Sequence, residues 1–374
     1  MSALTNFASM NEDFLNKKLQ DRIDANALRS LIVNKNKIDL CSNDYLGIVK
    51  NKLLEKIIQQ DMPSGSTGSR LLSGNYAFIN ETENFIADFH QAGTALIFNS
   101  GYDANVGLLA CVPQKEDVII YDKLSHASIR DGIRLSFAAS FSFLHNDMDD
   151  LEKKLIAAQS AQHIFVVTES VFSMDGDTAP LLEISALCEK YNAALIVDEA
   201  HATGIIGAKG EGLVQQLDLQ NHCFARVHTF GKACGCHGAV ILGSKKLREY
   251  LINFARPFIY STSLPPLAVA AIKAAYTIFP ALNEERIHLN HLIEIFKIKA
   301  LKYDVLKSDT PIQVVIVPGN EQVKKVAGSL QKNNFDVRAI LCPTVPKDQE
   351  RLRIVFHSFN TKEEVKKLIE LLQL

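Results

Sequence analysis

Short apolar runs rich in β-branched residues recur between residues 94 and 244, and they constrain the fold more than any other feature of the chain. Each run is followed by polar or glycine positions and then by a helical pattern. Strands that are apolar on both faces suit a mostly parallel sheet covered by helices, so we predict an α/β fold. The predicted strands are TALIFNS (94–100), DVIIYD (117–122), HIFVVTE (163–169), AALIVDE (193–199), ARVHTF (225–230) and GAVILGS (238–244).

The pattern changes at RPFIYSTSLPP (256–266), which predicts a second, smaller α+β domain. A chain of 374 residues fits this division, because single cores stop growing at roughly 250–300 residues. We expect an N-terminal helical segment at 1–40, a large α/β domain at 41–265 and a small C-terminal domain at 266–374. The N-terminal segment should form an amphipathic helix within residues 11–34 that packs on the body or on a partner. The predicted elements of the small domain are strands at 311–317, 338–342 and 351–356 and helices at 321–333 and 361–373.

Charge and cysteine content exclude several classes of protein. Forty Lys and Arg against 42 Asp and Glu leave a net charge of -2, so no overall basic field favours nucleic acid or an anionic membrane. The seven cysteines include no CxxC pair, which disfavours a disulfide framework and a zinc site. With no signal-peptide pattern and no apolar run of the roughly 18–20 residues that span a bilayer, we expect a cytoplasmic protein without a bound metal.

Reactive side chains follow several predicted strands. Asp198 and His201 follow one strand, Lys232 follows the next, and Glu169 and His126 lie after two others. Ligands of open α/β sheets bind beyond the carboxyl ends of the strands. The sequence separation of Asp198 and Lys232 allows one crossover helix and one further strand, so adjacent strand ends can present both groups to one ligand.

A lysine amine and a carboxylate in this arrangement suit pyridoxal 5'-phosphate (PLP). The amine can bind the cofactor covalently, and the carboxylate can keep the pyridine nitrogen protonated, so that the ring accepts electrons. The phosphate needs backbone N–H groups and hydroxyls at a helix N-terminus. Ser100, Gly101 and Tyr102, after the first strand, and Thr229, beside the lysine, can supply them.

Each of these residues alone also has an ordinary structural explanation. Strands often end in Asp-Glu, Lys232 could be a solvated loop lysine, and His126 and His201 could cap helices. The Gly-rich string SGSTGSRLLSGN (64–75) lacks GK[ST] and has no clear strand before it, so a nucleotide-binding loop is disfavoured. The ordered combination is what favours the cofactor site.

The chain resembles the α-oxoamine synthase family of fold-type-I PLP enzymes from residue 42 to residue 346. This resemblance implies a large domain with a mostly parallel seven-stranded sheet flanked by helices. The strings that carry it are SNDYLG (42–47), GSTGSRLLSGN (65–75), FNSGYDAN (98–105), DKLSHAS (122–128), TESVFSMDGD (168–177), DEAHATG (198–204), HTFGK (228–232), YSTSLPP (260–266) and PTVP (343–346).

The resemblance also implies roles for the cofactor-binding residues. Lys232 would form the Schiff base with PLP, and Asp198 would pair with the pyridine nitrogen. His201 would bond the ring hydroxyl, while His126 would stack on the ring and take part in catalysis. The remaining residues implied in cofactor binding are Gly101, Tyr102, Ser173 and Thr229.

Substrate and subunit contacts are implied in the same way. Arg29 and Thr344 match substrate-binding positions, and Asn43 and Glu169 lie in matching active-site strings. Members of the family are homodimers with shared active sites, and Ser261 or Thr262 would reach the phosphate in the neighbouring subunit.

The implied reaction is a decarboxylative condensation of an amino acid with an acyl thioester of coenzyme A or of an acyl-carrier protein. The resemblance is greatest to the branch that joins L-alanine to a pimeloyl thioester in biotin synthesis. Branches that use glycine or serine with other acyl groups remain open, as does, less favoured, an aminotransferase of the same fold. A non-catalytic partner subunit is disfavoured because Lys232 is present.

One position departs from the family pattern. Relatives carry an arginine three residues before the threonine of PTVP to bind the amino-acid carboxylate, but this chain has Leu341 there. A carboxylate in a partly dry pocket favours a bidentate guanidinium. Arg338, Arg351 or Arg353 could replace the missing group.

Overall fold

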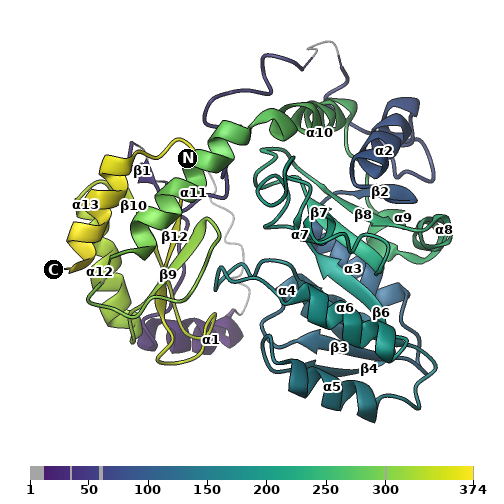
Figure 1. The fold of residues 1–374 in the computed structure, drawn as a ribbon, viewed down its shortest axis with the longest axis horizontal. Helices are drawn as coiled ribbons and strands as arrows, with labels where there is room; N and C mark the ends of the chain where they lie inside the picture. Colours follow the sequence, from purple (N-terminus) through teal and green to yellow (C-terminus); the bar gives the residue numbers. More distant parts are fainter. Residues whose placement is uncertain (1–11, 34–35, 59–61, 300, 374) are drawn as a thin grey trace, which may run out of the picture.

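The computed structural model describes residues 12–33, 36–58, 62–299 and 301–373, which form two domains side by side (Figure 1). The larger domain contains a seven-stranded sheet with the strand order β2-β8-β7-β6-β5-β3-β4. β8 is antiparallel to both of its neighbours, and the other strand pairs are parallel. The predicted α/β fold with a mostly parallel sheet is therefore confirmed. The strands are β2 (Thr94–Phe98), β3 (Val118–Asp122), β4 (Ala139–Phe143), β5 (Ile164–Glu169), β6 (Ala194–Asp198), β7 (Cys223–Thr229) and β8 (Ala239–Gly243).

Separate apolar clusters cover the two faces of this sheet. Val227 and Ile241 belong to one cluster with helix residues such as Leu108, while Val166 and Val197 belong to another with Leu151. Burial on both faces explains why these strands read as continuous apolar runs. The helices of the large domain are α2 (Ala77–Phe89), α3 (Gly101–Cys111), α4 (Ala127–Leu135), α5 (Met148–Ala157), α6 (Leu181–Lys190), α7 (Leu213–Gln216), α8 (Lys245–Phe254) and α9 (Arg256–Ile259).

The smaller domain is built on an antiparallel sheet with the order β11-β12-β9. A short parallel pair of β1 and β10 brings the segment before residue 40 into this domain. Helix α10 contacts α2 of the large domain, so the boundary that we predict at 265/266 lies before a helix that packs on the large domain. The elements are β1 (Ile38–Asp39), α10 (Pro266–Ile278), a 3-10 turn (Phe279–Ala281), α11 (Asn283–Lys297), β9 (Ile312–Ile316), α12 (Asn320–Lys332), β10 (Phe335–Asp336), β11 (Arg338–Ile340), β12 (Arg351–Val355) and α13 (Lys362–Gln373).

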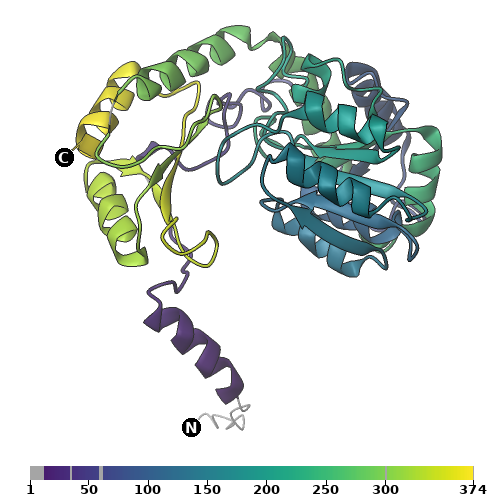
Figure 2. The same cartoon turned by 60° about the horizontal axis from the view of Figure 1, so that its bottom comes forward.

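The N-terminal helix is shorter than the sequence predicts. Helix α1 covers Asp13–Asp24, and Asn26, two residues after its end, adopts a positive φ of 50°, which interrupts the helical backbone. No residue of α1 is buried, and Figure 2 shows the helix standing clear of both domains. The sequence predicts that this helix packs either on the body or on a partner, and the structure does not show it packed on the body.

Strand β4 is missing from the sequence prediction. Its residues, ASFSF, alternate small polar and aromatic side chains, and most of them are exposed because the strand lies at the edge of the sheet. An exposed edge strand lacks the continuous apolar run that marks its buried neighbours.

Among the described residues, no single helix is long and apolar enough to cross a membrane. Helix α10 with its 3-10 turn and helix α11 meet that test only as a pair, and this pair is bent by 68°.

A hairpin at residues 170–178, here called the junction hairpin, links the two domains. It follows β5, is closed by a bridge between Val171 and Thr178, and reaches toward the small domain in Figure 1. The carbonyl oxygen of Gly176 accepts hydrogen bonds from Ser308 Oγ (2.7 Å) and Thr310 Oγ1 (2.8 Å) of the small domain. The contact depends on a close backbone approach, since a Cβ at Gly176 would lie 2.2 Å from the Ile312 carbonyl oxygen.

We predict that Gly176→Ala destabilises the protein. The residue has φ +78°, and strain of this kind costs roughly 1–3 kcal/mol before the clash with Ile312 is added. Urea unfolding followed by circular dichroism measures the change. Gly328→Ala in α12 is the control, because nothing lies within 4 Å of its Cβ position. Equal stability of the two variants would contradict this reading of the junction.

Candidate active site

One cavity of about 310 Å3 collects most of the residues singled out in the sequence. It lies at the carboxyl ends of β5, β6 and β7 and at the N-terminus of α3. Asp198 and Lys232 share this cavity rather than facing separate ones. The lining residues are Asn43, Ser100, Gly101, Tyr102, Asn105, His126, Ser128, Glu169, Asp198, Ala200, His201, Thr229, Gly231, Lys232, His237 and Gly238.

The Asp198 carboxylate is held in place by two donors. Asn105 Nδ2 donates to Oδ2 at 2.7 Å, and the backbone N–H of Ala200 donates to Oδ1 at 2.8 Å. A carboxylate has about four acceptor positions, so Asp198 keeps capacity for a further donor in the cavity. The side chain is buried, which strengthens its interaction with any cation placed there.

The Lys232 amine lies close to a group of charged side chains. Burial lowers its pKa below the usual range, while Asp198 and Glu169 act in the opposite direction and Arg353 lowers it further. A lowered pKa increases the fraction of neutral amine at neutral pH, and only the neutral amine is a nucleophile or a base. Burial and the Asp198 charge raise the pKa of Glu169 well above its ordinary value, which favours its protonated form.

The two predicted histidines occupy different parts of the cavity wall. His126 is the N-cap of α4: its Nδ1 accepts from the Ser128 backbone N–H, as the ordinary capping explanation allows. Its own backbone N–H donates to Glu169 Oε1 at 2.6 Å. His201 Nδ1 lies 2.6 Å from the hydroxyl oxygen of Tyr45, and burial keeps its pKa well below the usual value. Both rings therefore line the cavity.

The N-terminus of α3 forms one end of the cavity. Ser100 is its N-cap and accepts from the Asp103 backbone N–H, which leaves Gly101 and Tyr102 in the first turn. A Cβ at Gly101 would lie 2.4 Å from Thr229 Cγ2, so only glycine allows this approach of helix and strand end. Free N–H groups at such a terminus, with the Thr229 hydroxyl beside them, suit a phosphate.

The cavity residues fit PLP. A buried amine, a carboxylate anchored through Asn105 and a glycine-lined helix N-terminus match the aldehyde, pyridine nitrogen and phosphate of that cofactor. Sequence reasoning missed Asn105 and Ser128, which connect His126 to Asp198. Ser128 Oγ lies 2.8 Å from His126 Nδ1 and accepts from Asn105 Nδ2 at 3.0 Å. Asn105 lies one helical turn after Gly101 in α3, and from this spacing its place at the cavity could have been predicted.

Some predicted residues lie outside the cavity lining. Arg29 and Thr344 contact each other, with Nη2 2.8 Å from Oγ1. Ser173 lies in the junction hairpin, where its carbonyl oxygen accepts from Arg353 Nε at 2.6 Å. Ser261 and Thr262 line a separate small cleft beside Phe98 and Phe258.

Among the three candidate arginines, Arg353 differs from the other two. Arg338 pairs with Asp336 at 2.7 Å and Arg351 with Asp175 at 2.6 Å. Arg353 instead donates to two neutral oxygens, those of the Ser173 carbonyl and, at 3.0 Å, of the Asn43 side chain. Its charge lowers the pKa of Lys232, which places it near the cavity. Leu341, at the position of the family arginine, packs against the apolar core.

Comparison with known proteins gives the family. The profile of the family "aminotransferase class I and II" matches residues 35–372. The 8-amino-7-oxononanoate synthase of Emericella nidulans is 41% identical over 96% of this chain and 94% of its own length. The chain belongs to the class I and II aminotransferase family, in its α-oxoamine synthase branch. Members of the family depend on PLP, so the expected cofactor agrees with the family.

Solved structures of family members agree with the fold. The serine palmitoyltransferase of S. paucimobilis, solved with a PLP–myriocin aldimine, superposes with a TM-score of 0.85 at 27% identity, covering 96% of both chains. The 8-amino-7-oxononanoate synthase of Francisella tularensis gives a TM-score of 0.76 at 28% identity, covering 91% of this chain and 98% of that one. The PLP-dependent fold type I is therefore confirmed.

We predict that Asn105→Ala weakens PLP binding. The change removes a hydrogen bond to a buried carboxylate, a loss that corresponds to roughly a ten- to hundredfold change in affinity. Absorbance titration of the cofactor-free protein with PLP measures the dissociation constant. Asn253→Ala is the matched control, since in the described part of the chain that side chain bonds to the Glu249 carbonyl of its own helix. Equal PLP affinity in the two variants would show that Asn105 does not fix Asp198.

Proposed function

We propose that this protein catalyses the condensation of L-alanine with a pimeloyl thioester in biotin synthesis. The products are 8-amino-7-oxononanoate, CO2 and the free thiol of coenzyme A or of an acyl-carrier protein. A carbon–carbon bond forms between the alanine Cα and the thioester carbonyl, and the bond from Cα to the carboxylate breaks. Lys232 and Asp198 in one cavity, within a chain 41% identical to a named 8-amino-7-oxononanoate synthase, carry this proposal.

Lys232, Asp198 and the N-terminus of α3 would hold PLP. Bound PLP supplies an electron sink that stabilises negative charge at the alanine Cα. Asp198 would pair with the pyridine nitrogen, and His201 with the ring hydroxyl. His126 would lie against the ring face. The N–H groups of Gly101 and Tyr102 would bind the phosphate with the help of Thr229, and Ser173 would complete the cofactor site.

Lys232 is also the proposed base. Its amine lies in a buried cavity where its pKa is lowered, so at neutral pH it can accept the Cα proton more readily than an exposed lysine. Asp198 lies near enough to raise the pKa of Lys232 and thus to stabilise the ammonium form that results. His126 would help to polarise the thioester oxygen.

Arg353 is the proposed partner of the alanine carboxylate. It is 8% exposed, and the described structure gives it no carboxylate partner. A nearly buried guanidinium with neutral partners gains most from an anionic ligand. Its contact with Asn43, a cavity residue, directs it toward the site. Arg353 would thus take the role of the arginine that is expected at position 341, where this chain has leucine. Arg29 and Thr344 would contribute further substrate contacts.

The active site is proposed to be shared in a cytoplasmic homodimer. Ser261 and Thr262 line a cleft apart from the main cavity, as expected if they serve the neighbouring subunit. Helix α1 exposes Phe14, Leu19 and Ile23, apolar area that a second subunit could cover.

A serine palmitoyltransferase-type activity is the second candidate, because a solved structure of that enzyme superposes with a TM-score of 0.85. A screen of alanine, glycine and serine against pimeloyl, acetyl, succinyl and palmitoyl thioesters tests both candidates. Product mass identifies the pair that reacts. Production of 8-amino-7-oxononanoate supports the proposal; a long-chain product from serine refutes it.

Lys232→Ala should abolish turnover in this screen while leaving the fold intact. The residue follows a strand end in the cavity wall, so its removal takes away the base without opening the apolar core. Far-ultraviolet circular dichroism checks the fold, and loss of the visible band of the PLP-loaded enzyme checks the covalent attachment. Retained turnover would reject the proposed role of Lys232.

Arg353→Lys should raise KM for alanine by roughly ten- to hundredfold, the effect of losing hydrogen bonds to a charged ligand. Initial rates at saturating thioester measure it. Arg338→Lys, whose parent residue already pairs with Asp336, serves as the control. An unchanged KM in the Arg353 variant would assign the carboxylate to another group.

A further inference from the structure

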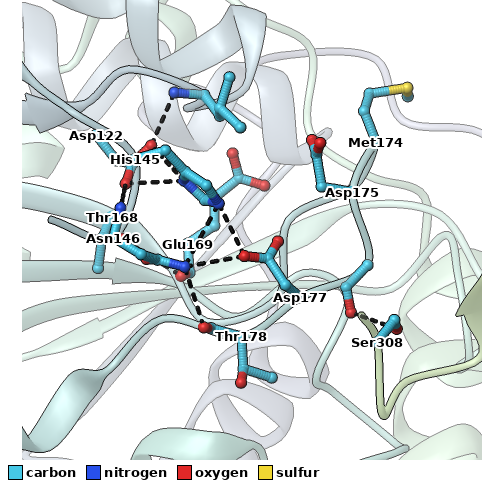
Figure 3. Close-up of polar contacts among 12 residues, drawn as sticks. Asp122, His145, Asn146, Thr168, Glu169, Met174, Asp175, Asp177, Thr178 and Ser308 are labelled. Atoms are coloured by element: carbon cyan, nitrogen blue, oxygen red, sulfur yellow. Dashed lines mark hydrogen bonds and ion pairs between the residues drawn. The ribbon is translucent and has the colours of Figure 1, made fainter. Parts of the chain in front are cut away.

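A charged cluster outside the cavity holds the base of the junction hairpin. His145, two residues after β4, lies between two carboxylates, as Figure 3 shows. Its Nδ1 lies 3.0 and 3.1 Å from the two carboxylate oxygens of Asp122, and its Nε2 lies 2.8 Å from Asp177 Oδ2. With an acceptor at each nitrogen, the ring can satisfy both contacts only as the doubly protonated cation.

The electrostatics of the cluster agree with this geometry. Burial alone would lower the pKa of His145, but hydrogen bonds to Asp122 and Asp177 raise it to about 10. Asp122 is fully buried at the end of β3 and also accepts from the backbone N–H groups of Leu124 and Asn146. The cation is therefore anchored to the large sheet on one side and to the hairpin on the other.

Further contacts tie the hairpin to the same point. The His145 ring meets the buried ring of Phe172 edge-on, with centroids 4.4 Å apart. Asn146 Nδ2 donates to Asp177 Oδ2 at 2.9 Å and to the Thr178 carbonyl at 3.2 Å. Inside the hairpin, the Phe172 N–H bonds to the Asp177 carbonyl at 3.0 Å. Fixing Asp177 thus fixes the segment of the hairpin that leads to Ser173.

The opposite side of the junction hairpin contacts the small domain. The Ser173 carbonyl accepts from Arg353 Nε, and Asp175 pairs with Arg351. The hairpin also starts beside the cavity, because Ser170 N–H donates to the Asp198 carbonyl at 2.9 Å. A displacement of the hairpin would therefore move the acceptor that orients the Arg353 guanidinium.

We propose that His145 is a positioning residue for amino-acid binding, which acts through Asp177 and the junction hairpin to hold Arg353 at the cavity. The inference rests on the proposed role of Arg353 as the partner of the substrate carboxylate. His145 is not among the residues that line the cavity, so we expect its substitution to act through Arg353 and to affect amino-acid binding more than thioester binding.

The test is the affinity of the PLP-loaded His145→Asn enzyme for L-alanine, titrated alone and followed by the visible absorbance of the cofactor. We expect the dissociation constant to rise roughly tenfold, a size typical of substitutions that act through an intermediate element. KM for the thioester should change less than twofold, whereas a general loss of structure would alter both constants. Unchanged alanine affinity would overturn the inference.

Hydrogen exchange of the cofactor-free protein gives a second readout. The amides of Phe172 and Gly176, which are bonded within the hairpin, should exchange faster in His145→Asn than in the parent protein. His163→Asn is the matched control. The His163 ring also pairs with a carboxylate, that of Asp117 at 2.9 Å, but it lies directly before β5, at the opposite end of this strand from the cavity. If His145→Asn fails to fold, Asp177→Asn, which keeps the side-chain volume, carries the same expectations.

A double-mutant cycle separates this inference from the proposed function. If His145 acts through Arg353, His145→Asn should not weaken alanine binding further in an Arg353→Lys background. A full additional loss there would overturn the route through Arg353. If Arg353→Lys leaves alanine affinity unchanged, the proposed carboxylate partner is wrong; if only His145→Asn is without effect, the positioning role alone fails.

Discussion

The anchoring of Asp198 is the constraint on which the site depends. A carboxylate buried at a strand end is costly unless donors surround it, and here Asn105 and the Ala200 N–H supply them. Parallel pairing of β6 and β7 then brings the next strand end, with Thr229 and Lys232, to the same cavity. The amine loses solvation there, which lowers its pKa, while Asp198 limits that shift. Fold topology and electrostatics thus place an amine and a carboxylate where one cofactor can lie between them.

In the proposed function, the small domain contributes to the site a charge that its own described residues do not neutralise. Arg338 and Arg351 are matched by Asp336 and Asp175, so neither has a free charge to offer. Arg353 bonds only to neutral oxygens in the described structure. Because the Ser173 carbonyl belongs to the large domain, the orientation of this guanidinium depends on how the two domains meet.

Sequence reasoning was most accurate where burial imposes a pattern. Six strands are apolar on both faces, and several of them end in reactive residues. The strands and these residues could therefore be predicted from local composition; the strands are β2, β3, β5, β6, β7 and β8. Strand β4 and the end of α1 could not, since an exposed edge strand and a helix with no buried face lack that pattern. Asn105 and the choice of Arg353 depend on contacts between segments far apart in the chain, which no local pattern encodes.

Leu341 stands where the resemblance leads us to expect an arginine, and under our proposal the carboxylate contact is made from another part of the small domain instead. Leu341 joins the apolar core of the small domain, so that position no longer presents a charge. Arg353, the proposed partner of the carboxylate, lies on β12 in the centre of the three-stranded sheet, where register with β9 and β11 fixes its backbone. A guanidinium on a central strand is better preorganised than one on the segment before PTVP, because fewer backbone states must be restricted when the substrate binds. The remaining freedom lies in its side chain, and the junction hairpin restricts that from the other domain.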